Sequence, residues 1–311
     1  MTSTPSQPRI AVTGSSGFLG AALVPALGAA GWQVIRVTRT AGTGAGTAQW
    51  DPARGLLDPA ALAGVDAVIH LAGAPIDTRW TPEYKRTIRT SRVDSTALLA
   101  RTLASLRPRP SVLLSASAVG IYGDRGDTEL DEASTLGDGY LADVGRAWEA
   151  AAAPARDAGI RVVHPRLGLA LARGGGALAK MLPPFELGAG GKIGRGTQWM
   201  SWIARDDLVE ALEFILRTPA LSGPVNVTSP NPVTNAEFAR TLGQVLHRPA
   251  VATIPPFVVR LLYGELADAG LLTSQRAVPR RLLAAGFVFG HPTLESALRH
   301  ELLSSHASRL V

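Results

Sequence analysis

Short apolar runs alternate with helix-like stretches along the first half of the chain. Five runs have the length and β-branched content of buried strands, and they cover residues 10–13, 33–38, 67–71, 111–117 and 160–165. A further short strand is expected to end near Trp50. Three stretches are typical of helices, namely residues 21–30, 82–106 and 140–157. This alternation predicts an α/β fold, a doubly wound parallel sheet with helices on both faces.

The pattern changes after Arg166. Gly and Pro residues over 173–196 predict long loops, and they are followed by a helix over 206–217, a strand over 225–228 and mainly helices from residue 235. A hairpin-like piece is expected around residues 286–291. We therefore expect a doubly wound domain over residues 8–165 and a smaller, mainly helical lobe over residues 166–311. Segments within about 200–228 are expected to return to the first domain.

A glycine-rich turn follows the first predicted strand and opens the first predicted helix. In this context Gly14 permits a tight turn, Gly17 lets the backbone approach a pyrophosphate, and Gly20 allows close helix–strand packing. The helix N-terminus then stabilises phosphate charge. The alternative is a glycine-rich turn without a ligand. We expect a dinucleotide-binding site here, formed by Gly14, Ser16, Gly17, Phe18, Leu19 and Gly20.

The end of the second predicted strand bears on which dinucleotide binds. An acidic residue there would accept hydrogen bonds from the ribose hydroxyls and favour NAD. The chain has Thr38 and Arg39 instead, and a guanidinium suits a 2′-phosphate. We therefore expect NADP in preference to NAD. The alternative is that Arg39 is one more surface arginine.

The strand over residues 67–71 ends in small residues. Leu71, Ala72 and Gly73 are expected to pass close beside the cofactor and to leave it room. His70, just before them, is expected to pack at the strand end rather than to act in catalysis.

The composition removes several classes of function. The formal net charge is +6, but the positive residues are scattered singly, which favours a solvated surface or a small anionic ligand over nucleic acid. The absence of cysteine excludes disulfides, a thiolate nucleophile and a zinc–cysteine site. The six histidines show no ligand-like pairing, so no metal is expected. Residues 1–9 do not have the pattern of a signal peptide, and no apolar run could span a bilayer. We expect a cytoplasmic protein with no membrane partner.

Several motifs together resemble a known family. They are TGSSGFLG (13–20), HLAG (70–73), SASAVGIYGDRG (115–126), WEAA (148–151), GGGALAKMLPPF (174–185), QWMSWI (198–203) and TNAEF (234–238). The chain is similar to the epimerase-like family of atypical, extended short-chain dehydrogenases from Arg9 to about Leu302. Members are catalogued as NAD(P)-dependent sugar-nucleotide epimerases or oxidoreductases with a C-terminal segment of unassigned function. The resemblance implies a two-lobed fold and nucleotide binding at Thr38, Arg39, Leu71, Ala72 and Arg92.

The catalytic residues of short-chain dehydrogenases are only partly present. A serine orients the substrate oxygen in that family, and Ser117 at a strand end is the candidate here. The alternative for Ser117 is a hydrogen bond to backbone. The family's tyrosine is paired with a lysine four residues later on the same helix face. Tyr140 stands at about the right distance, but the residue four positions on is Val144.

Two roles for a tyrosine stay open. Without the lysine, the pKa of Tyr140 would stay near about 10, so it would be a poor base but could donate a proton in carbonyl reduction. Tyr122 could serve instead, because it lies just past the same strand, although packing is an equal alternative.

Three charged segments are weaker candidates for substrate contacts. The loop over residues 124–127 is either a solvated turn or a substrate contact, and the loop over 188–196 with Lys192 and Arg195 would suit an anionic group. Asp206 and Asp207 are expected to cap a helix rather than to act as a catalytic pair.

Two hypotheses of function follow. The first is an NADP(H)-dependent oxidoreductase or epimerase whose second lobe binds a small carbonyl or sugar-like substrate, an anionic one being compatible with the basic loops. The second is an NADP(H)-binding, redox-sensing or regulatory protein with little turnover. A homodimer is compatible with either.

Overall fold

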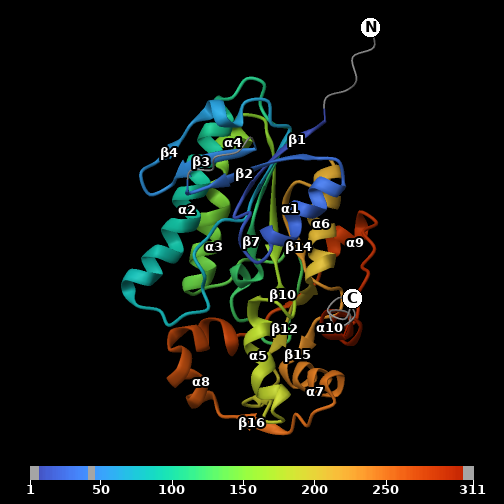
Figure 1. The fold of residues 1–311 in the computed structure, drawn as a ribbon. Coiled ribbons are helices and arrows are strands. Elements are labelled where there is room, and N and C mark those ends of the chain that lie inside the picture. The colour runs from blue at the N-terminus through green and yellow to red at the C-terminus, as the bar shows by residue number, and fades with distance from the viewer. Residues whose placement is uncertain (1–6, 41–45, 304–311) are drawn as a thin grey trace.

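The computed structural model describes residues 7–40 and 46–303, and its centre is a parallel sheet (Figure 1). The sheet confirms the doubly wound α/β prediction. In spatial order its strands are β14 (Gly223–Val227), β9 (Arg161–Leu167), β6 (Val112–Ser115), β5 (Ala67–His70), β1 (Arg9–Thr13), β2 (Gln33–Thr38), β3 (Thr47–Asp51) and β4 (Leu56–Leu57). All neighbours pair in parallel except β3 and β4.

The strand order reverses between β1 and β5. From β1 the chain adds β2 and β3 on one side, and from β5 it adds β6, β9 and β14 on the other. Ligands of open α/β sheets bind at such a switch point, outside the carboxyl ends of the strands. The fold therefore places a ligand site where β1 and β5 end.

Helices cover both faces of the sheet because alternate strand residues point to opposite sides. Ile10 and Val12 pack in one cluster with Leu23 and Leu212, whereas Ala11 packs in another with Leu99. The helices are α1 (Gly20–Ala29) and α6 (Arg205–Arg217) on the first face, and α2 (Pro82–Ser105), α3 (Tyr140–Ala150) and α4 (Ala153–Asp157) on the second. Both α6 and β14 come from beyond residue 166 in the chain.

The smaller lobe has its own core. Leu178, Phe185, Trp202, Phe238 and Leu298 are among the buried side chains that hold its helices together. One helix, α5 (Gly176–Glu186), precedes α6 in the chain. The others follow α6, and they are α7 (Asn235–Leu246), α8 (Pro256–Tyr263), α9 (Arg280–Ala284) and α10 (Leu294–Leu303).

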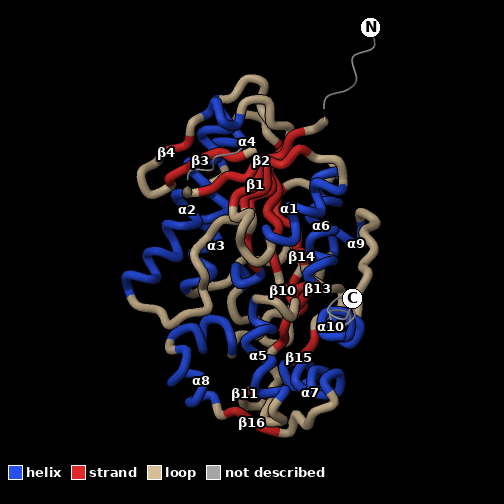
Figure 2. The backbone as a smooth tube through the Cα atoms, viewed as in Figure 1, coloured by secondary structure: helices blue, strands red, loops and turns tan. Residues whose placement is uncertain are grey.

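Short strands, red in Figure 2, form two-stranded pairs within this lobe, and one further pair joins it to the first domain. The pairs are β10 (Leu169–Leu171) with β13 (Trp202–Ala204), β11 (Gly191–Ile193) with β16 (Ala252–Ile254), β12 (Trp199–Met200) with β15 (Val233–Thr234), and β8 (Glu129–Leu130) with β17 (Arg276–Ala277). Three single turns of helix complete the described elements: Pro59–Leu62, Val119–Tyr122 and Ala267–Leu271.

Several predicted elements differ in detail. The helix expected over 140–157 is two helices, because Pro154 lacks the backbone N–H that would continue α3. The strand expected over 111–117 ends at Ser115, and β7 (Ser117–Ala118) pairs with β9 alone. The hairpin expected around 286–291 is not formed, because Phe287 and Phe289 pack into the core from irregular chain that pairs with no strand there.

The predicted helix cap is also wrong. The residue before α6 is Ala204, with no side-chain capping bond. Asp207 instead accepts hydrogen bonds from the backbone N–H groups of Gly290 and His291, at 2.8 and 3.0 Å. Within the described part of the chain, no helix is long and apolar enough to cross a membrane.

Candidate functional site

The glycine-rich turn between β1 and α1 is closely packed against the end of β5. Gly14 has φ +69°, and a Cβ there would stand 2.9 Å from the carbonyl carbon of Leu71. A Cβ on Gly20 would stand 2.1 Å from the Gly14 oxygen. The Gly17 N–H donates to the Gly14 oxygen at 3.0 Å, which closes the turn. The N–H groups of Ala21 and Ala22 donate to the Gly17 and Leu19 oxygens, at 2.8 and 3.1 Å. This glycine cradle, residues 14–20, can therefore offer the phosphates of a dinucleotide the N–H groups that precede them, at the N-terminus of α1.

Thr13 fastens the end of β5 beside the cradle. Its Oγ1 accepts hydrogen bonds from the N–H groups of Leu71 and Ala72, both at 3.2 Å. The same oxygen lies 2.7 Å from His70 Nδ1, so its own proton goes to that nitrogen. His70 Nε2 then donates to Thr96 Oγ1 at 2.9 Å. Burial, reinforced by the charge of Arg92, lowers the pKa of His70 to about 4, so a neutral His70 packs at the strand end.

Arg92 lies beside the segment that leaves β5. A Cβ on Gly73 would stand 3.2 Å from the Arg92 guanidinium carbon, so a side chain there would push this arginine by a few tenths of an ångström. The guanidinium stacks over the Trp148 ring, 5.1 Å from its centre, and one nitrogen donates to the Ile88 oxygen at 3.1 Å. Burial lowers the pKa of Arg92, but it stays a cation, held at the switch point of the sheet.

The smaller lobe reaches the cradle through the loop before α5. Gly175 and Gly176 lie against the Phe18 ring, where an added Cβ would stand 2.5 and 3.1 Å from ring carbons. One turn further along α5, Lys180 Nζ lies 2.5 Å from Asp77 Oδ2, on the loop that follows Gly73. The start of α5 thus contacts both the glycine cradle and the segment that follows β5; the groove here means the region between these two, where β1 and β5 end. Of the other predicted cradle residues, Ser16 is exposed and Leu19 half-buried.

Thr38 and Arg39 stand at the end of β2, next to β1. Thr38 Oγ1 donates to the backbone oxygen of Thr40 at 2.8 Å. Arg39 is exposed, and its side chain makes no hydrogen bond or ion pair with another described residue. Its guanidinium is therefore accessible to a ligand.

Ser117 faces the interior rather than the groove. Its side chain is 1% exposed, and its hydroxyl donates to Glu149 Oε1 at 2.7 Å. Glu149 also receives two hydrogen bonds from Arg166, at 2.8 and 2.9 Å. Burial alone would lower the pKa of Arg166, but the paired carboxylate raises it overall. The geometry favours a structural role for Ser117 over the catalytic role for which it was the candidate, and its partner is a carboxylate rather than the backbone of the alternative.

Tyr122 belongs to the same buried network. Its hydroxyl is within hydrogen-bond distance of Asn226 Oδ1 at 2.8 Å and of the Asp131 backbone oxygen at 2.9 Å, and it accepts from Arg166 at 3.0 Å. The side chain is fully buried, and burial raises its pKa. These contacts favour the packing alternative for Tyr122.

Tyr140, the first residue of α3, is the one of the three catalytic candidates that lines a pocket, together with Trp80 and Lys85. Its hydroxyl donates to the backbone oxygen of Lys85 at 2.5 Å, and Lys85 Nζ lies 4.5 Å from the centre of its ring. Burial raises the pKa of Tyr140, while the nearby charges of Arg92 and Arg89 act to lower it. A lysine therefore does lie beside this tyrosine, but it comes from α2 rather than from one turn along α3.

Of the remaining charged candidates, the loop over residues 124–127 contacts the smaller lobe. Asp124 Oδ1 accepts from the Ser274 N–H at 3.2 Å, and Asp127 Oδ1 accepts from Trp199 Nε1 at 2.9 Å. Lys192 lies in β11, paired with β16, and Arg195 is exposed. The aspartates of the loop over residues 124–127 therefore already accept hydrogen bonds from other parts of the protein.

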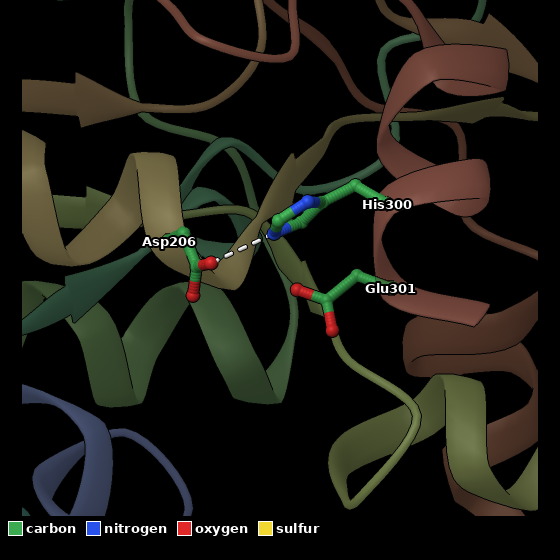
Figure 3. Close-up of side chains that lie close together, drawn as sticks. All are labelled: Asp206, His300 and Glu301. Carbon is green, nitrogen blue, oxygen red and sulfur yellow. Dashed lines mark hydrogen bonds and ion pairs between the residues drawn. The ribbon is translucent and has the colours of Figure 1, made fainter. Parts of the chain in front are cut away.

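One group of acidic and imidazole side chains gathers where α6 meets α10 (Figure 3). Among the described residues, Asp206, His300 and Glu301 have ligand-type atoms within 4.8 Å of one another. His300 Nε2 lies 2.8 Å from Asp206 Oδ2, and Arg205 brings a positive charge to 3.7 Å from the same carboxylate. The arginine balances the acidic charge, so we interpret the group as an ion-pair cluster that joins the two helices. Asp206 lies too far along the chain from His300 and Glu301 for sequence spacing to reveal the group.

Sequence reasoning missed Glu149, Arg166 and Lys85. Signals for the first two were present, because Glu149 interrupts an Ala-rich helix and Arg166 ends an apolar strand. A charge in such a position needs a buried partner. Lys85 gave no signal, because its approach to Tyr140 depends on how α2 and α3 pack.

Comparisons with known proteins show the family and agree with the fold. Residues 10–228 match the model of the NAD dependent epimerase/dehydratase family, and residues 254–301 match a domain of unknown function, DUF1731. The chain is 44% identical over 290 residues to Epimerase family protein MT2273 of Mycobacterium tuberculosis, covering 93% of this chain and 96% of that protein. It is 39% identical to the chloroplastic Epimerase family protein SDR39U1 homolog of Arabidopsis thaliana, covering 94% and 86%. The structure of human epimerase family protein SDR39U1 (isoform 2) with NADPH superposes with a TM-score of 0.86 at 36% identity, covering 94% and 98%.

Proposed function

Since this chain belongs to the NAD dependent epimerase/dehydratase family, we propose that it reduces small carbonyl compounds with NADPH. The observation that carries the proposal is Tyr140. Its hydroxyl lies at the start of α3, 2.5 Å from the Lys85 backbone oxygen, and burial, which raises its pKa, keeps it protonated. Arg92 is close enough to act on it electrostatically, and the Arg92 guanidinium packs against Gly73, just beyond the end of β5. A protonated donor next to a fixed cation is what the reduction of a carbonyl group requires of the protein.

The residues divide the work by position. The glycine cradle and the start of α1 hold the phosphates of the dinucleotide, and Leu71, Ala72 and Gly73 leave room beside it. When bound, NADPH supplies a hydride for the carbonyl carbon. Tyr140 gives its proton to the carbonyl oxygen, and Arg92 stabilises the negative charge that develops there.

Reduction suits these residues better than epimerisation. An epimerase needs a base to remove a proton from its substrate, and the raised pKa of Tyr140 disfavours the phenolate. Lys85 lies over the face of the tyrosine ring and pairs with Glu265 at 2.6 Å, so its charge is partly neutralised.

Tyr140→Phe tests the catalytic part of the proposal. A general acid contributes about 10²–10⁴-fold to a rate, so kcat for NADPH oxidation with a carbonyl panel should fall by that factor while KM stays nearly constant. Tyr263→Phe, on α8, is the matched control and should leave kcat unchanged. Equal rates for wild type and Tyr140→Phe would exclude Tyr140 as the proton donor.

The preference for NADP rests on Arg39. Its exposed guanidinium at the end of β2 can pair with a 2′-phosphate, and the human relative was solved with NADPH. Arg39→Glu should weaken NADPH binding by about 10–100-fold and NADH binding far less. Arg101→Glu, the same charge change on an exposed part of α2, is the control. Equal losses for NADPH and NADH would remove Arg39 from the site.

A second candidate function is an NADP(H)-binding regulatory protein with little turnover. It is favoured by the position of Ser117, whose hydroxyl is given to Glu149 and does not face the groove. Tight binding of NADPH with no oxidation across a broad carbonyl panel would select this function. A cytoplasmic location and a homodimer stay predictions from the sequence.

A further inference from the structure

A cavity of about 360 Å³ opens at the N-terminal ends of α2 and α3. Its wall includes Trp80, Lys85, Arg86, Arg89, Tyr140 and, from the smaller lobe, Glu265. The volume is in the range of small-molecule sites. It shares Tyr140 with the catalytic site proposed above, so a molecule bound in it lies next to the proton donor.

The charges of this cavity are unbalanced. Three cations face one carboxylate, and Lys85 Nζ already lies 2.6 Å from Glu265 Oε1. Arg86 approaches Glu83 at 3.4 Å on the exposed surface of α2. Arg89 makes no ion pair with any described residue, although it stands close enough to Tyr140 to influence it electrostatically. The positive end of the long helix α2 adds to the same potential.

The cavity also has an aromatic corner. The rings of Trp80 and Tyr140 meet edge to face with their centres 5.1 Å apart. Trp80 is fixed in place, because its indole N–H donates to the Ile76 oxygen at 2.8 Å. An apolar or planar group would contact these rings while a charged group reached Arg89.

We propose that this cavity selects small carbonyl compounds that carry an oxyanion, a carboxylate or a phosphate, and that Arg89 binds that oxyanion. The arginine fork suits both anions through paired hydrogen bonds. Glu265 competes with the ligand for Lys85 and so restrains binding. Since Glu265 lies within the segment that matches the domain of unknown function, this gives that segment a part in the site. The inference rests on the proposed reductase for the identity of the reacting group.

Binding and turnover are measured separately. Binding is measured by calorimetry on NADP⁺-saturated protein, in which reduction cannot proceed, and turnover by loss of NADPH absorbance. Two matched pairs serve as probes: benzoylformate with benzoylformamide, and dihydroxyacetone phosphate with dihydroxyacetone. The pair that shows the larger preference for its anion distinguishes carboxylate from phosphate.

The variants shift binding in opposite directions. Arg89→Ala should weaken the preferred anion by at least about tenfold and leave its neutral partner unchanged. Glu265→Gln should strengthen the anion several-fold by releasing Lys85, which no unfolded variant could imitate. Arg101→Ala, on the same helix but away from the cavity, should change neither.

The outcomes separate the two proposals. Anion binding that depends on Arg89, without any NADPH oxidation, supports the oxyanion site and overturns the reductase. NADPH oxidation whose KM for the anion does not respond to Arg89→Ala overturns the oxyanion site and leaves the reductase. Neither anion binding better than its neutral partner at up to about 10 mM also overturns the oxyanion site.

Discussion

Gly20 and Gly28 lie at opposite ends of α1 and differ in what surrounds them. A Cβ on Gly20 would stand 2.1 Å from the Gly14 oxygen and 2.7 Å from the Ser15 Cα, both backbone atoms. A Cβ on Gly28 would meet nothing within 4 Å. Gly20→Ala should therefore open the cradle, costing about 1–3 kcal/mol of unfolding free energy and most of the NADPH affinity. Gly28→Ala should gain up to about 1 kcal/mol, because alanine is the better helix former.

Chemical denaturation and fluorescence titration of NADPH check this pair. A Gly20→Ala variant that binds NADPH like the wild type would show that the turn can absorb the extra atom, and the phosphate-cradle interpretation would fail.

His70 makes the stability of the folded protein depend on pH. Its folded pKa of about 4 lies below the ordinary value of 6.5, because burial disfavours the charged ring. As pH falls from 6.5 to about 4, His70 binds a proton in the unfolded chain but stays neutral in the folded protein. Stability is therefore complete above pH 6.5 and is lost below it, by up to about 1.4 kcal/mol per pH unit.

Urea unfolding between pH 4.5 and 7 measures this loss. The variant His70→Gln lacks the titrating ring, so its stability should fall less steeply over the same window, whatever its absolute value. Parallel curves for the two proteins would mean that His70 does not contribute the proton.

At the residue scale the sequence predicted what depends on neighbours along the chain. Gly14 and Gly17 are recognisable because turn geometry is local, and His70 was correctly expected to pack. The hydrogen bond from Ser117 to Glu149 was not predicted, because Glu149 lies on another element. The approach of Lys85 to Tyr140 was likewise invisible, because it depends on the distance between two helices.

At the scale of elements, a buried ion pair joins α3 to β9. Arg166 is 4% exposed and Glu149 14% exposed, and two hydrogen bonds connect them. Removing one partner leaves an unpaired buried charge, at a cost of about 3–5 kcal/mol. Glu149→Met alone should lose that much stability, and Glu149→Met with Arg166→Met should recover a large part of it. A double-mutant cycle by urea unfolding measures the coupling, and additive losses would contradict the pairing.

Element boundaries followed the sequence wherever one periodicity ran unbroken. The helix α2 was predicted almost to its ends because Pro82 and Pro108 bound an amphipathic stretch. The helix over 140–157 was predicted as one piece because its alanines favour helix on both sides of Pro154. The hairpin expected near residue 287 was wrong, because Phe287 and Phe289 are buried in the core from chain that forms no strand between α9 and α10.

At the scale of the whole molecule, the strand order of the sheet and the position of the smaller lobe both shape the groove where β1 and β5 end. The doubly wound prediction followed from alternating elements, which is a global property that a single sequence reveals well. The approach of α5 to the glycine cradle did not follow, because it brings Gly175 against Phe18 across more than 150 residues of chain.

The last prediction concerns the ion pair that spans this groove. Lys180 and Asp77 lie 2.5 Å apart, with side chains 52% and 47% exposed, so their pair adds at most about 1 kcal/mol to folding. Lys180 stands on α5, which rests on Phe18 of the cradle, and Asp77 on the loop beyond Gly73, so the pair links the two sides between which NADP(H) is expected to bind. Lys180→Ala should leave unfolding nearly unchanged yet raise the dissociation rate of NADPH several-fold at low salt. At about 1 M salt, where screening acts within about 3 Å, the difference from wild type should vanish.

Stopped-flow displacement of NADPH measures that rate. Arg217→Ala is the control, because it breaks an exposed ion pair of 2.7 Å confined to α6. Equal dissociation rates for Lys180→Ala and wild type at low salt would show that the pair does not retain the cofactor. A rate that rises only in Lys180→Ala, and only at low salt, would make the contact between the lobes a determinant of cofactor exchange, because no direct contact with the cradle is altered.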